Sequence, residues 1–204
     1  MDSKQAELEL SVIKKIMDDT RNISLNNGWH YIFWAAIVGA ALIANYLMLI
    51  TRTAMDYIGW MWLILMIGAW IFEAIIGRKR EARQRVRTFA GKMLASLWLA
   101  SGAVMFMFGF IGPISGAYNS IYICPIISTV IGVAFFISGE IQLLKWQKVL
   151  SICWWLGAIL LFMFPSVHTL LIFAIMLISL QAIPGIIMNR KFKKEMGSNM
   201  SVEV

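Results

Sequence analysis

The sequence predicts an all-α integral membrane protein with six transmembrane helices, arranged as three hairpins and preceded by a cytoplasmic amphipathic helix. Three observations lead to this prediction. The 204 residues are 60% hydrophobic and only 14% charged, whereas about a quarter of the residues in an ordinary soluble domain are charged. Six apolar runs are each long enough to cross about 30 Å of hydrocarbon. Nearly all Lys and Arg residues fall before the first run, after every second run or after the last.

The first expected element is an amphipathic helix within residues 1–28. In residues 5–20 the apolar side chains Leu8, Val12 and Ile16 recur at every fourth position, and charged side chains occupy the other face. The sequence NNG that follows favours the end of this helix before the first apolar run. Such a helix either lies in the lipid interface or docks onto a cytoplasmic protein or a second copy of the chain, and both interpretations stay open.

Residues 29–189 form the expected transmembrane domain. Its six spans are predicted over residues 30–50, 57–77, 93–112, 119–144, 149–164 and 167–189. The first span is longer than the apolar part of a typical signal peptide, so we expect it to be retained. The fifth is the shortest, and Trp154 and Trp155 could extend it into the membrane interface. Tyr31, at the start of the first span, is expected in the same interface because aromatic rings prefer that depth.

Small residues predict which faces of two spans pack closely against other helices. Ala36, Ala40 and Ala44 follow one line along the first span, and Ser128 and Gly132 follow another along the fourth. Small side chains at this spacing let two helix backbones approach each other. We therefore expect helix contacts, rather than a pore wall, along both lines.

The distribution of positive charge predicts the orientation of the chain, because Lys and Arg in short loops are retained on the cytoplasmic side. Of the 18 basic residues, 17 fall before the first span, after the second, after the fourth or in the tail formed by residues 190–204. Only Arg52 falls on the other side. Both termini are therefore expected in the cytoplasm, and the expected location is a cytoplasmic membrane of the prokaryotic type.

The densest basic segment follows the second span. It contains Arg78, Lys79, Arg80, Arg83, Arg85 and Arg87. A basic loop beside the cytoplasmic leaflet is expected to contact anionic lipid headgroups. The net charge of +7 is thus explained by topology, and nucleic acid is not an expected partner. The other partners that the sequence allows are a second copy of the chain and a cytoplasmic protein.

Two carboxylates lie inside the predicted spans, where an ionisable side chain is costly and is therefore a functional candidate. Glu73 lies five residues before Arg78, and Glu140 lies five residues before Lys145. Neither has a basic residue three or four positions later on its own helix. Each therefore needs a partner from another helix, a water-filled crevice or a proton. The structural alternative is a glutamate that is hydrogen-bonded to a neighbouring helix.

A third candidate, Gln181, lies near the end of the sixth span, shortly before Pro184 and Gly185. Proline has no N–H to donate to the carbonyl of Leu180, which predicts a kink to which Gly185 adds flexibility. Gln181 either satisfies a backbone group freed by the kink or lines an inward-opening cavity together with the glutamates.

The sequence contains no catalytic motif, and no enzyme activity, metal or cofactor is expected. His30 and His168 are predicted at opposite faces of the membrane, and so are Cys124 and Cys153, which excludes a disulfide between the two cysteines. We therefore expect an accessory, sensory or anchoring membrane subunit. The alternative is a small proton- or cation-coupled transporter that uses Glu73, Glu140 and Gln181. We favour the subunit, because transporters place their substrate sites near the midplane of the bilayer.

Overall fold

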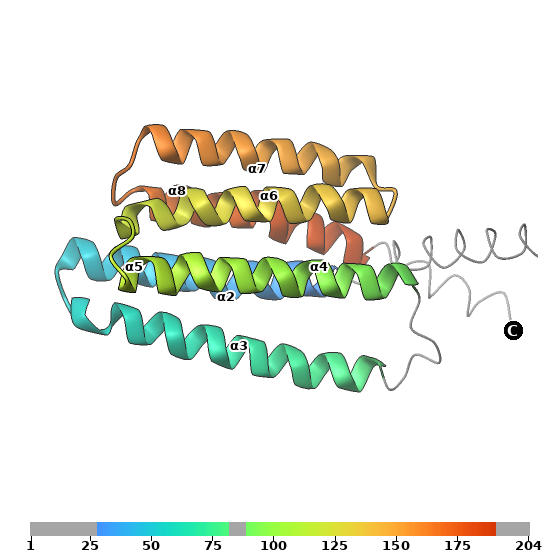
Figure 1. Ribbon diagram of the computed structural model, residues 1–204, viewed down its shortest axis with the longest axis horizontal. Coiled ribbons are helices and arrows are strands. Elements are labelled where there is room, and N and C mark those ends of the chain that lie inside the picture. The colour runs from blue at the N-terminus through green and yellow to red at the C-terminus, as the bar shows by residue number, and fades with distance from the viewer. Residues whose placement is uncertain (1–27, 82–88, 191–204) are drawn as a thin grey trace, which may run out of the picture.

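The computed structural model describes residues 28–81 and 89–190, and every element in these ranges is helical. The long elements are α2 (Trp29–Thr51), α3 (Ile58–Glu81), α4 (Phe89–Phe106), α6 (Ile123–Ile141), α7 (Lys145–Met163) and α8 (Thr169–Leu177) (Figure 1). Six helices in this part of the chain are long and apolar enough to cross a membrane. The all-helical class with six spans is thus confirmed, and the chain is a multi-pass membrane protein.

The six spans lie close to the predicted ones. They are Trp29–Thr51, Met55–Gly77, Phe89–Ile114, Ser120–Ile141, Lys145–Met163 and Thr169–Arg190. The fifth span begins at Lys145 instead of residue 149, because only three residues separate α6 from α7 and Leu143 takes a left-handed conformation between them (φ 57°). The amphipathic segment 5–20, the loop residues 82–88 and the tail residues 191–204 lie outside the described residues.

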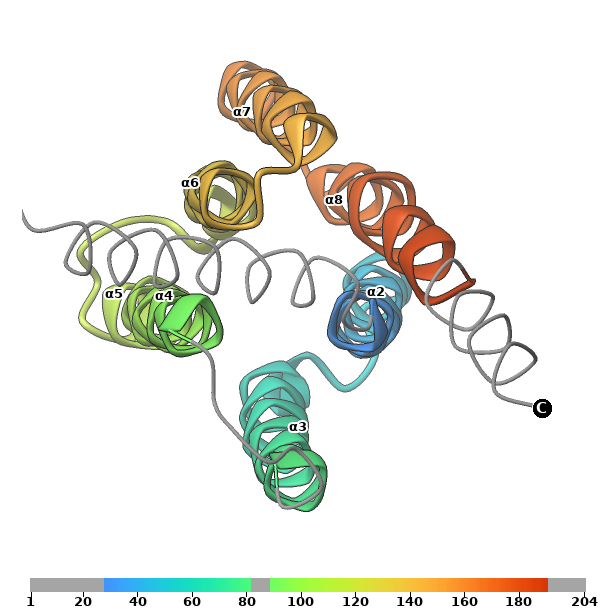
Figure 2. The same cartoon turned by 90° about the vertical axis from the view of Figure 1, so that its right-hand side faces the viewer.

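Successive helices run in opposite directions (Figure 1), and Figure 2 shows the bundle from one end. α2 packs against α3 on one side and against α8 on the other, while α6 packs against α4, α7 and α8. α3 and α7 form opposite edges of the bundle (Figure 2). The most extensive contact joins α6 to α7, which belong to different hairpins of the predicted set. The grouping into three hairpins therefore stays a prediction.

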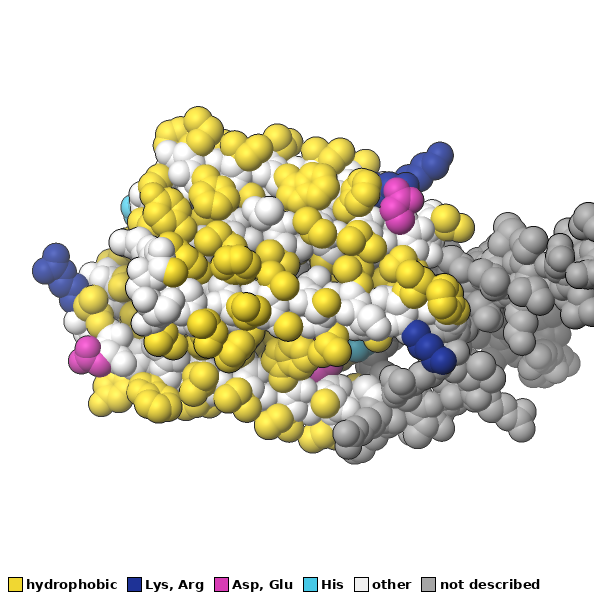
Figure 3. Space-filling view, in the orientation of Figure 1, with side chains coloured by type: hydrophobic (Ala, Val, Ile, Leu, Met, Phe, Trp, Pro, Cys, Tyr) yellow, Lys and Arg dark blue, Asp and Glu magenta, His cyan; other side chains and the backbone are white. Residues whose placement is uncertain are grey.

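The apolar core lies among α2, α6, α7 and α8. Trp154 is completely buried there, between Phe135 and Phe173. The expectation that Trp154 lies in the membrane interface is wrong, because α7 starts early enough to place this residue at half of its length. α3 and α4 bury little of their surface. On the face that Figure 3 shows, hydrophobic side chains are spread over the whole length between the two ends, and lipid tails solvate such a surface well.

The two lines of small residues have different outcomes. Ser128 Oγ donates a hydrogen bond to the carbonyl of Trp154 at 3.0 Å, and a Cβ on Gly132 would lie 2.4 Å from the indole of Trp155. The close contact predicted for the fourth span is thus confirmed, and α7 makes it. The contact predicted along the first span is wrong: Ala36 and Ala40 are exposed. An open apolar groove lies between this line and Leu65 of α3.

Two π-helical turns interrupt the spans, η2 (Met107–Ile111) and η4 (Ile178–Ala182). Each occupies the same place relative to a proline, ending two residues before Pro113 or Pro184. Since proline cannot donate to the carbonyl four residues earlier, the preceding turn widens and bonds five residues back. The missing hydrogen bond anticipated at Pro184 is thus accommodated by a π-turn.

The turn after η2 is fixed by an aromatic side chain. The Tyr118 hydroxyl donates to the carbonyl of Phe108, and the ring of Tyr118 occupies the space in which a side chain at Gly112 would lie. Partial burial raises the pKa of Tyr118.

Candidate functional site

The three candidate polar residues lie at one end of the bundle, at separate helix contacts. We call this the basic end, because Lys92 lies near the start of α4, Lys145 and Lys148 lie at the start of α7, and Arg190 ends the last span. Figure 1 shows these helix ends on the same side of the bundle. Glu73 on α3 bonds to α2, Glu140 on α6 pairs with α7, and Gln181 in η4 bonds to α2. The sequence therefore identified residues that reach other helices, but the two acids do not share a contact.

Glu73 is bonded to two side chains of α2. Its Oε1 lies 2.5 Å from His30 Nδ1, and Trp34 Nε1 donates to its Oε2 at 2.5 Å. His30 and Trp34 are four residues apart, so they lie on the same face of α2. The side chains of Glu73 and His30 are 28% and 48% exposed. Glu73 thus joins α3 to one face of α2 at a partly exposed position.

Aromatic rings complete the attachment of α3. Phe33 and Phe72 stack with ring centroids 5.1 Å apart, and Trp34 meets Trp70 edge to face at 6.2 Å. Trp70 also covers Gly102 of α4, where an added Cβ would lie 2.6 Å from the indole. Glu73 thus provides a polar contact within an aromatic layer that joins α3 to the rest of the bundle.

Glu140 forms an ion pair with Lys148 across the short turn between α6 and α7. The side chain of Glu140 is half exposed and that of Lys148 about one-third exposed. Exposed ion pairs of this kind contribute at most about 1 kcal/mol to stability. Glu140 is therefore a surface residue of the basic end. Its partner comes from another helix, which is one of the possibilities expected because α6 offers no basic residue three or four positions after Glu140.

Gln181 belongs to a chain of buried amides that the sequence did not reveal. Its Nε2 donates to the backbone carbonyl of Tyr31 at 3.3 Å. The Tyr31 hydroxyl accepts from Gln147 Nε2 at 3.3 Å, and Gln147 Oε1 accepts from Gln142 Nε2 at 3.2 Å. The three glutamines are at most 6% exposed. We call Tyr31, Gln142, Gln147 and Gln181 the amide chain; it joins α2, η4, the turn between α6 and α7, and the start of α7.

Sequence reasoning placed Tyr31 in an interfacial girdle and passed over Gln142 and Gln147. A signal was present in "IQLLKWQK", where two neutral amides accompany two lysines at a span end. A neutral amide can be buried at much lower cost than an ammonium group, provided that it is hydrogen-bonded.

The ends of the first and last spans meet backbone to backbone. A Cβ on Gly28 would lie 2.0 Å from the carbonyl oxygen of Gly185, and a Cβ on Gly185 would lie 2.8 Å from the carbonyl oxygen of Gly28. Gly185 was expected to add flexibility to the last span. Its place in the structure gives it a different role, since it allows this close approach beside Gln181.

The basic segment after the second span is only partly described. The backbone of Arg78, Lys79 and Arg80 forms part of the last turns of α3, while Arg83, Arg85 and Arg87 lie outside the described residues. Their contact with anionic headgroups therefore stays a prediction.

Within residues 28–81 and 89–190, no group of three or more His, Cys, Asp or Glu side chains is placed to hold a metal ion. Cys124 and Cys153 are free thiols. Comparison of the chain with protein-family models, with curated proteins and with solved structures finds no match.

Proposed function

We propose that this multi-pass membrane protein is a non-catalytic accessory, sensory or anchoring subunit whose cytoplasmic face meets a protein partner or anionic lipid headgroups. One observation carries the proposal: each candidate polar residue is engaged in a contact between elements of the bundle. Glu73 bonds to α2, Glu140 pairs with α7, and Gln181 bonds to α2 from η4. Polar side chains that are used in this way hold helices together.

The transporter alternative is favoured by one specific feature, the pair formed by His30 and Glu73. A carboxylate beside an imidazole can take up and release a proton, and both side chains are partly exposed. A coupled transporter would in addition need Glu140 and Gln181 on the same path. Their contacts with Lys148 and with the carbonyl of Tyr31 favour a structural role for both.

A flux measurement separates the two functions. The protein is reconstituted into vesicles that contain a pH-sensitive dye, and a pH gradient is imposed. We expect no more proton flux than in empty vesicles, and no difference among the wild type, Glu73→Gln and Glu140→Gln. Protein-dependent flux that Glu73→Gln and Glu140→Gln each abolish would establish the transporter instead.

The partner is tested by deletion of residues 1–20, which removes the predicted amphipathic helix and leaves all six spans. After chemical cross-linking in native membranes, we expect the full-length chain to carry a cross-linked protein partner that the deleted chain lacks. Membrane insertion, measured by resistance to alkaline extraction, should be equal for both chains. The same cross-linked proteins on both chains would contradict docking through this segment.

A further inference from the structure

The first three spans and the last three are arranged on the same plan. In each half the first helix packs against the second, α2 against α3 and α6 against α7. The third helix of each half packs mainly against the first helix of the other half, α4 against α6 and α8 against α2. Because successive helices run in opposite directions, equivalent helices of the two halves are antiparallel (Figure 1). The second helices of the two halves, α3 and α7, lie at opposite edges of the bundle (Figure 2).

Two details of the helices agree with this plan. The third span of each half contains a π-turn that ends two residues before a proline. The first and second helices of each half also carry stacked aromatic rings at the end away from their connection, Phe33 with Phe72 in one half and Tyr122 with Phe162 in the other. Neither feature is needed to cross a membrane. Together they describe an inverted repeat of two three-helix units.

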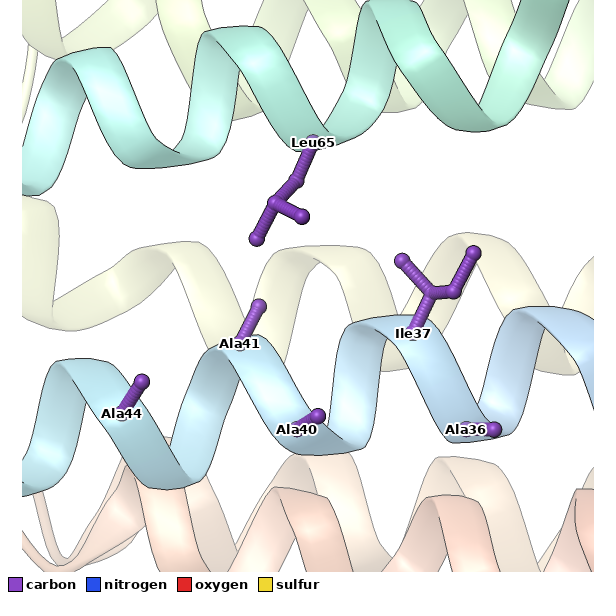
Figure 4. Close-up of a pocket in the computed structure, with 6 residues that line it drawn as sticks. All are labelled: Ala36, Ile37, Ala40, Ala41, Ala44 and Leu65. Carbon is purple, nitrogen blue, oxygen red and sulfur yellow. The ribbon is translucent and has the colours of Figure 1, made fainter. Parts of the chain in front are cut away.

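The equivalent helix pairs differ in how closely they pack. Between α6 and α7, Ser128 Oγ donates to the carbonyl of Trp154, and the indole of Trp155 occupies the space in which a side chain at Gly132 would lie. Between α2 and α3 the bonds lie at the basic end, and an open apolar groove separates Leu65 from α2 farther along (Figure 4). One half of the repeat is therefore closed and the other is open.

A lipid bilayer makes both arrangements accessible to either pair. No hydrophobic force holds two helices together in a bilayer, because lipid tails are as apolar as the side chains. A helix that moves away from its neighbour loses dispersion contacts and a few polar bonds, and lipid solvates the surface that it exposes. When the closed pair opens as the open pair closes, the same fold results, turned over. The free-energy difference between these two states then comes from the sequence differences between the halves.

The aromatic rings between α2 and α6 connect the two pairs. Tyr31 of α2 contacts Phe135 of α6 with ring centroids 5.3 Å apart, and Phe135 contacts Trp154 of α7 at 6.2 Å. The hydroxyl of Tyr31 also accepts from Gln147 at the start of α7. A movement of α2 toward α3 therefore displaces groups against which α7 packs.

We propose that the bundle switches between two states by exchanging the arrangements of its two halves. In the observed state α7 is closed on α6 and α3 is open; in the second state α3 is closed on α2 and α7 is open. The switch goes beyond the proposed subunit function and does not depend on it, although two states are what a sensory subunit needs in order to report a signal.

Distances between spin labels test the exchange in the full chain, reconstituted into lipid nanodiscs. The two native cysteines are replaced by serine. Labels are then attached to new cysteines at exposed positions of one helix pair at a time, Ile43 and Ile67 for α2 and α3, and Val133 and Ile152 for α6 and α7. Pulsed electron paramagnetic resonance gives the distribution of each distance.

Gly132→Leu forces α7 away from α6, because its side chain overlaps the indole of Trp155. We expect the distance between α6 and α7 to lengthen and that between α2 and α3 to shorten, each by about 2 Å or more. Gly59→Leu is the matched control, since Gly59 is exposed and a Cβ built on it would meet no atom of another helix within 4 Å. This variant should leave both distances unchanged.

A milder variant covers the case in which Gly132→Leu does not fold. Ser128→Ala removes one bond of the closed pair and little volume, so it should shift both distances in the same directions to a smaller extent. Opening of α7 with an unchanged distance between α2 and α3 would overturn the exchange, because the halves would then move independently. Unchanged distances at both pairs in Ser128→Ala and in folded Gly132→Leu would also overturn it.

Discussion

Substitution of Gly28 by Ala is expected to separate the start of α2 from the end of the last span and to destabilise the bundle by about 3 kcal/mol. The new methyl group would lie 2.0 Å from the carbonyl oxygen of Gly185 and 2.7 Å from its carbonyl carbon. These are backbone atoms, so no side-chain rotation can relieve the overlap. Denaturation of the purified protein in detergent, followed by circular dichroism, measures the loss.

Gly39→Ala is the matched control for this substitution. Gly39 lies on the same helix, and a Cβ built on it would meet no atom of another helix within 4 Å. Alanine favours a helix over glycine by about 1 kcal/mol, so this variant should be as stable as the wild type or slightly more stable. Equal destabilisation by Gly28→Ala and Gly39→Ala would contradict the close approach of the two spans.

Substitution of Gln147 by Leu is expected to cost about 2–3 kcal/mol, because it removes the centre of the amide chain. Gln147 is fully buried and bonds on one side to Gln142 and on the other to the hydroxyl of Tyr31. Leucine has a similar size but leaves both groups without this partner. The same denaturation measurement, made in the same detergent, gives the cost.

The order of effects within the amide chain checks this interpretation. Gln142→Leu removes the bond that Gln142 donates to Gln147 but leaves the bond between Gln147 and Tyr31 in place, so it should cost less than Gln147→Leu. A larger effect of Gln142→Leu would show that packing at the turn between α6 and α7, rather than the amide chain, determines stability at this end.

The spans could be predicted because a long apolar run has one stable arrangement in a bilayer, a helix that satisfies its own backbone. The partners of the polar side chains could not be predicted in this way. Glu73 needs a donor from another helix by simple geometry, yet its partner His30 is 43 residues away, and Gln181 meets Tyr31 over 150 residues. No local pattern encodes which helices become neighbours around the bundle.

The two lines of small residues also show that a local sequence pattern does not determine which helix lies against it. Ser128 and Gly132 have a helix against them, while Ala36 and Ala40 line an open apolar groove between α2 and α3 (Figure 4), although both lines have the same spacing. The difference lies in the facing helix, because α7 packs closely on the fourth span whereas α3 leaves a groove along the first. Spacing along one helix therefore identifies surfaces that can be approached, and the facing helix determines whether they are.

The π-turn before Pro184 changes the rotational phase of the last span. In an uninterrupted α-helix Gly185 would point about 80° away from Leu177, because eight residues turn the helix by about 800°. A π-turn absorbs one residue, which brings the two positions to within about 20° of each other. Leu177 faces the core and Gly185 meets Gly28, so both lie on the packed side of the span. The span is thus two helical segments of different phase, and Pro184 sets the offset that lets both of them face the bundle.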